Sequence, residues 1–113
     1  MDRKENTSPS AQIERIAAME ERMKRAVDAL SALIAALDGY DAARADFREL
    51  AAYYDGGDWR ADFEDDEAGR LPSPADLPRG VLSEDGIYDL LELERDVLGR
   101  MAETAGERME ETV

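Results

Sequence analysis

The sequence of 113 residues contains no cysteine and no histidine. These absences exclude disulfide scaffolds, zinc fingers, thiol catalysis and acid–base chemistry that depends on imidazole. Basic residues are also scarce: 14 stand against 28 acidic ones and leave a net charge of −14. Such a charge opposes contact with phosphate backbones and anionic lipid. We therefore expect a protein that is not an enzyme and that binds neither nucleic acid directly nor a membrane.

Long apolar runs are lacking as well. The longest apolar-rich run, residues 29–37, is far shorter than the roughly 20 residues that cross a bilayer. The first ten residues are polar, and no apolar segment typical of a secretory signal follows them. We expect a cytoplasmic protein with a disordered polar amino terminus over residues 1–8 and a single helical-bundle domain over residues 9–110.

Apolar residues recur three and four positions apart from residue 13 onward, which predicts an amphipathic helix. Ser8-Pro9 is expected to start this helix and Asp38-Gly39 to end it. Six acidic and six basic residues cancel over positions 1–37, so all of the net charge lies after this helix. The apolar stripe therefore suits the centre of a bundle, a dimer seam, or both. Its heptad positions hold Ile13, Ile16, Met23, Val27, Leu30, Ile34 and Leu37, with Glu20 as the polar member.

Two further helices are expected in the middle of the chain. The same spacing over residues 40–54 predicts a second helix that folds back on the first as an antiparallel hairpin. A short acidic helix is expected over residues 59–68, capped by Asp58 and ended by Gly69. Three prolines within residues 71–80 then predict an extended connection.

The last long helix has the clearest start signal. Ser83 is expected to cap it, Glu84 to begin it, and Leu82 to pair with Ile87 as a hydrophobic staple. No segment alternates apolar and polar residues as a half-buried strand does. The expected fold class is all-α: a helical bundle of two long helices, a shorter one and a short acidic helix, with a Pro-rich extended connection.

Two carboxylates interrupt the apolar faces, Glu20 in the first helix and Glu94 in the last. A buried carboxylate costs several kcal/mol unless a cation, a donor or water accompanies it. If the two helices run parallel, both glutamates lie at one level, near the end of the second helix. The sequence thus predicts a candidate polar pocket formed by Glu20, Glu94, Tyr54, Trp59 and Arg60. The alternatives are a structural ion pair and a glutamate that is exposed at the rim.

Acidic clusters suggest metal binding, but their spacing argues against it. The acidic run over residues 55–67 lacks the glycine and the final glutamate that an EF-hand loop requires. Glu64–Glu67 and Asp89–Glu92 have the separation of Mg²⁺-binding turns, yet the first pair lies just before a helix end and a Pro-rich loop. We therefore expect no catalytic residue, no metal and no cofactor.

Several motifs together are similar to a bacterial family. They are Arg15-Ile16, Met19-Glu20, Tyr53-Tyr54, Trp59, Asp62, Leu71-Pro72 and the continuous segment from Arg79 to Tyr88. Over roughly residues 13–101 the chain resembles the small bacterial proteins known as domain of unknown function forty-two ninety-eight. The resemblance implies a bacterial, cytoplasmic, single-domain helical protein in which Trp59 and residues 79–88 form one structural unit. It implies no catalytic residue.

Three functions remain to be compared. The leading hypothesis is a non-enzymatic helical interaction module, homodimeric through the first or the last helix. The alternative is an acidic inhibitor or antitoxin that imitates nucleic acid and occupies a basic protein partner. A Mg²⁺-dependent carboxylate-site hydrolase is the second alternative. Salt separates the first two, because a complex held by charge weakens as ionic strength rises, whereas an apolar dimer does not.

Overall fold

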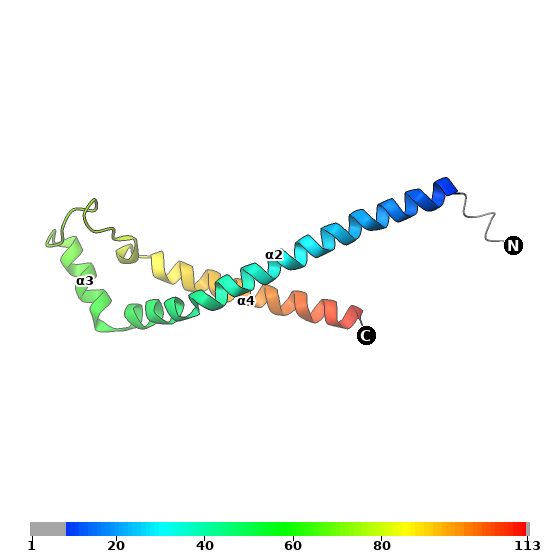
Figure 1. Ribbon diagram of the computed structural model, residues 1–113. Coiled ribbons are helices and arrows are strands. Elements are labelled where there is room, and N and C mark those ends of the chain that lie inside the picture. Colours follow the sequence, from blue (N-terminus) through cyan, green and yellow to red (C-terminus); the bar gives the residue numbers. More distant parts are fainter. Residues whose placement is uncertain (1–8, 113) are drawn as a thin grey trace. The chain divides into compact units, whose positions relative to one another are not determined.

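The computed structural model describes residues 9–112 (Figure 1). It contains the α-helices α2 (Pro9–Asp55), α3 (Gly57–Glu67) and α4 (Gly86–Glu111) and the 3-10 helix η1 (Gly80–Leu82). No strand occurs among these residues, and the expected all-α class with two long helices and a short acidic one is confirmed. Residues 1–8, expected to be disordered, lie outside the described residues. None of the described helices combines the length and the apolar character needed to cross a bilayer.

α2 continues without a break through Gly39, where the sequence predicts its end. That prediction is wrong, and so is the antiparallel hairpin after it: residues 40–54 belong to the same helix. A glycine inside a helix costs only about 1 kcal/mol relative to alanine. The alanine-rich turns on both sides of Gly39 favour the helix strongly enough to outweigh that cost.

The structure consists of two compact units that divide within α2, between Ala43 and Arg44. The described residues of the first unit form the amino-terminal part of α2, and none of them is buried. The second unit comprises the remainder of α2 together with α3, η1 and α4. The single domain expected over residues 9–110 stays a prediction.

The core of the second unit consists of Trp59 from α3, Leu82 from η1 and Ile87 from α4. Leu82 and Ile87 share this core as predicted, but they do not form the predicted hydrophobic staple, because the N-cap of α4 is Asp85 and not Ser83. The predicted unit of Trp59 with residues 79–88 is confirmed. Partly buried side chains surround the core, and they are Leu50, Tyr53, Tyr54, Phe63, Leu71 and Leu91.

α3 ends at a glycine, as the sequence predicts. Gly69 has a φ of 75°, a left-handed value that a residue without a Cβ adopts easily. The N–H groups of Gly69 and Arg70 donate to carbonyl oxygens of the last turn at 3.0 and 2.9 Å, the pattern of a Schellman motif. The start differs from the prediction: Gly56 is the N-cap, and Asp58 lies in the first turn, where its charge favours the helix dipole.

α4 begins at Gly86, two residues later than predicted, with Asp85 as its N-cap. Ser83 does not cap it, because its hydroxyl donates to the carbonyl oxygen of Gly80 at 2.9 Å. Gly86 approaches the same turn closely: a Cβ at this position would lie 2.8 Å from the Gly80 carbonyl oxygen. Any larger residue at position 86 must therefore displace the backbone of η1.

Two glycine substitutions are expected to act in opposite directions. Gly86→Ala lowers the free energy of unfolding by about 1–3 kcal/mol, because the added methyl group overpacks the turn. Gly39→Ala raises it by up to about 1 kcal/mol, because the methyl group meets nothing within 4 Å and alanine favours the helix. Denaturant unfolding at one fixed protein concentration measures both. Effects of the same sign would contradict the close approach at Gly86.

Candidate functional site

The indole ring of Trp59 is the centre of the residues that the structure brings together. Its Nε1 donates to the carbonyl oxygen of Val81 at 2.8 Å. The ring packs edge-on against Tyr54 and stacks with Phe63, with centroids 5.1 and 5.2 Å away. The Arg60 guanidinium lies over the indole, 5.8 Å from its centroid. Tyr54, Trp59 and Arg60 of the predicted polar pocket therefore do lie together, in an aromatic cluster built on a buried ring.

The two glutamates of the predicted pocket occupy different units. Glu20 is exposed on the first unit, in a surface hollow that it shares with Met23, Lys24 and Val27 of the same helix. Glu94 is half-buried on α4 in the second unit. The common level of these two glutamates stays a prediction.

A hydrogen bond that the sequence analysis missed joins α2 to α3. The Tyr53 hydroxyl donates to Asp62 Oδ2 at 2.7 Å. Burial raises the pKa of Tyr53 to about 12, assisted by this hydrogen bond and by the negative charges of Asp62 and Asp58. The only sequence signal for the pair is that Tyr53 and Asp62 both stand in the motifs that carry the family resemblance.

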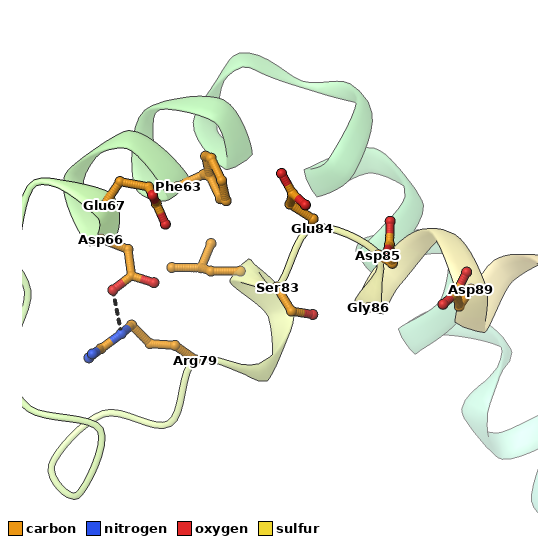
Figure 2. A pocket seen from close by; sticks show the side chains of 10 residues that line it. Phe63, Asp66, Glu67, Arg79, Ser83, Glu84, Asp85, Gly86 and Asp89 are labelled. Carbon is orange, nitrogen blue, oxygen red and sulfur yellow. Dashed lines mark ion pairs between the residues drawn. The ribbon is translucent and has the colours of Figure 1, made fainter.

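An open surface hollow of about 770 Å³ lies between α3, η1 and the start of α4 (Figure 2). Phe63 and Leu82 supply its apolar side chains. Three of its acidic residues stand at or near the amino end of α4, where the partial positive charge of the helix stabilises them. The lining carboxylates are Asp66, Glu67, Glu84, Asp85 and Asp89, and Arg79 is the basic residue among them.

Arg79, the arginine of the hollow, is fixed by an ion pair and by hydrogen bonds to the backbone. Its Nε lies 2.7 Å from Asp66 Oδ1, and the Arg79 and Asp66 side chains are only 17% and 26% exposed. The Nη1 group of Arg79 also donates to the carbonyl oxygens of Pro72 and Leu77. Figure 2 shows the ion pair at one side of the hollow. Arg79 thus ties the Pro-rich connection to α3, a role that the sequence analysis missed.

The predicted Mg²⁺-binding pairs lie only partly in the hollow. Glu67 and Asp89 line it, whereas Glu64 and Glu92, their partners in the predicted Mg²⁺-binding pairs, do not. Across residues 9–112, no group of three or more acidic side chains is arranged to hold a metal ion. The hydroxyl proton of Ser83 is already donated to Gly80. Five carboxylates and one arginine line the hollow, so its surface is negatively charged and attracts cationic groups.

Trp59 substitutions are expected to separate packing from hydrogen bonding. Trp59→Ala lowers the free energy of unfolding by about 3 kcal/mol or more, because it empties the centre of the core. Trp59→Phe keeps an aromatic ring but removes the N–H donor, and is expected to cost about 1 kcal/mol. Denaturant unfolding at matched protein concentration measures both. A loss below about 1 kcal/mol for Trp59→Ala would show that the ring is not the anchor of this core.

Because the pKa of Tyr53 is raised in the folded protein, we expect the free energy of unfolding to fall in alkali. The folded pKa of about 12 exceeds the ordinary value of 10.0, so between these pH values the folded protein keeps a proton that the unfolded chain has lost. The stabilisation is therefore complete below pH 10.0 and declines as pH rises toward 12. In a tyrosinate absorbance titration, Tyr53→Phe should lose the component near 12, and Asp62→Asn should move it to lower pH. An unchanged titration in Tyr53→Phe would contradict the assignment.

Comparison with known proteins identifies a family. The chain matches the family described as Domain of unknown function (DUF4298) over residues 16–104. This range includes the whole core and every residue that lines the hollow. No curated protein and no solved structure matches the chain. The resemblance predicted from the motifs is confirmed, and the chain belongs to the domain of unknown function DUF4298 family.

Proposed function

We propose that this chain is a non-enzymatic helical interaction module that forms a homodimer through α2. The observation that carries the proposal is an exposed apolar stripe on the first unit. Contiguous apolar surface of this kind is unusual on a monomeric protein and is typical of an interaction site. Its nine large side chains are 37–66% exposed, and they are Ile13, Ile16, Met19, Met23, Val27, Leu30, Leu33, Ile34 and Leu37.

The lack of buried residues on α2 supports the same proposal. Helices in proteins gain most of their stability from packing of an apolar face. α2 is 47 residues long and buries none of its residues, while the buried core of residues 9–112 consists of three residues on other elements. A second copy of the chain supplies the missing packing, at about 25 cal/mol for each Å² of apolar surface removed from water.

The polar groups of the second unit support a role without catalysis. Arg79 is engaged with Asp66, Ser83 with Gly80, and Tyr53 with Asp62. These side chains position α3, η1 and the Pro-rich connection, so their chemistry is used within the fold. We place the protein in the bacterial cytoplasm, a location that the absence of cysteine fits.

Two matched substitutions test the homodimer. Leu30→Glu places a charge in the stripe, and it should raise the dimer dissociation constant about hundredfold or more, because burying a carboxylate costs several kcal/mol. Ala32→Glu adds the same charge to the opposite side of α2 and should leave the dimer intact. Sedimentation over a concentration series measures both. A wild-type chain that stays monomeric at every concentration, or equal effects of the two variants, would refute the proposal.

The acidic inhibitor remains the second candidate, and the carboxylates around the hollow favour it. It requires a basic protein partner, and its complex should dissociate between low and moderate salt. The proposed homodimer should persist under the same conditions, because apolar contacts are not screened by ions. Sedimentation of the wild-type chain at two ionic strengths tests the homodimer, and retention of a basic protein by the immobilised chain at the same two ionic strengths tests the inhibitor.

A further inference from the structure

The stripe on α2 follows a heptad pattern with one charged member. Its seam positions run from Ile13 to Leu37, and the pattern is that of a two-stranded coiled coil. Glu20 occupies the one seam position in this range that is not apolar. If a second copy covers this stripe, as the proposed function requires, the two helices must run either parallel or antiparallel, and Glu20 distinguishes these arrangements.

A parallel pair in register brings each seam residue against its own equivalent. Glu20 would then meet Glu20 of the second copy within an apolar seam. Two carboxylates in such a position repel each other and lose hydration. An antiparallel pair avoids this contact, because equivalent residues meet only at the centre of the pair and Glu20 lies away from it.

The charge distribution favours the same orientation. All of the net charge of −14 lies in residues 38–113, which are attached at the carboxyl end of the stripe. A parallel pair attaches two such acidic segments at the same end. An antiparallel pair attaches them at opposite ends of a stripe about 36 Å long, the rise of 24 steps of about 1.5 Å from residue 13 to residue 37. Exposed charges separated by more than about 8 Å are largely screened at physiological salt.

The limits of the stripe set the register. An antiparallel pair centred at residue 25 matches the full apolar length, with Ile13 opposite Leu37, Ile16 opposite Ile34, and Met23 opposite Val27. A shift of one heptad toward the carboxyl end would place Asp41 opposite Ile16. We infer that the occupant of the α2 stripe is a second copy of α2, antiparallel and centred at residue 25.

Single cysteines test this arrangement cleanly, because the chain has none of its own. We would mix full-length Ile16→Cys with full-length Ile34→Cys carrying a size tag, then oxidise the mixture and resolve the products by mass. The antiparallel pair should give mainly the mixed disulfide, and each variant alone should give little. A parallel pair should give the opposite result: self-crosslinks of each variant and little mixed product.

Ala26→Cys is the conservative third variant, because a small side chain replaces a small one beside the seam. In the antiparallel pair it lies next to the centre and should crosslink to itself. In a parallel pair the two equivalent positions lie on opposite flanks of the seam and should not crosslink. This variant decides the orientation even if a cysteine in place of isoleucine weakens the pair.

Sedimentation before oxidation separates failure of this inference from failure of the proposed function. Monomers at every concentration would refute both. A dimer with self-crosslinks of Ile16→Cys or Ile34→Cys would overturn the orientation alone and leave the homodimer standing. A dimer in which no cysteine variant crosslinks would overturn the register and show that another surface joins the copies.

Discussion

The hydrogen bond from the Trp59 indole to the Val81 carbonyl oxygen is the constraint on which the second unit depends. It connects α3 to η1 across 22 positions of the chain and orients the largest of the three buried side chains in the part of the chain that the structure describes. Because the core is so small, the contacts around the Trp59 ring add to a position that this hydrogen bond already defines. The bond from Tyr53 to Asp62 and the pair of Arg79 with Asp66 hold α3 from two sides. We expect both contacts to weaken when the ring is removed, because the ring packs between the segments that they join.

A core of three residues also limits what the chain can stabilise alone. The free energy of folding is a small difference between burial and lost conformational entropy, and apolar area left in water does not contribute to it. α2 orders 47 residues while burying none of them. In the proposed homodimer the missing burial comes from association, so stability and self-association become one equilibrium that depends on protein concentration. Dimerisation would then be a condition of folding for the amino-terminal part of α2 rather than a later event.

Two glycines show how far local sequence patterns determine this fold. Gly39 follows Asp38 and Gly69 follows Ala68, and both glycines are predicted to end a helix. Gly69 does so, with a positive φ, and Pro72 soon after it prevents the helix from resuming. Gly39 is followed by helix-forming residues and no proline, so the helix continues. A glycine followed by a proline therefore predicts the end of a helix better than a glycine alone.

Heptad periodicity predicted the stripe of α2 correctly, but periodicity cannot say whether a helix of the same chain or a second copy covers it.

The site shows a different limit. A lone tryptophan in an acidic segment is predictable as an anchor, whereas the partner of Arg79 is not, because α3 offers six acidic residues and the choice depends on where the Pro-rich connection returns. Once the fold is known, much of the acidity around the hollow has a structural explanation: Asp66 pairs with Arg79, and Glu84, Asp85 and Asp89 stand at the amino end of α4. The fold offers no comparable reason for an apolar stripe on the charge-balanced segment of α2 over residues 13–37. That stripe is therefore the surface on which the proposed homodimer depends.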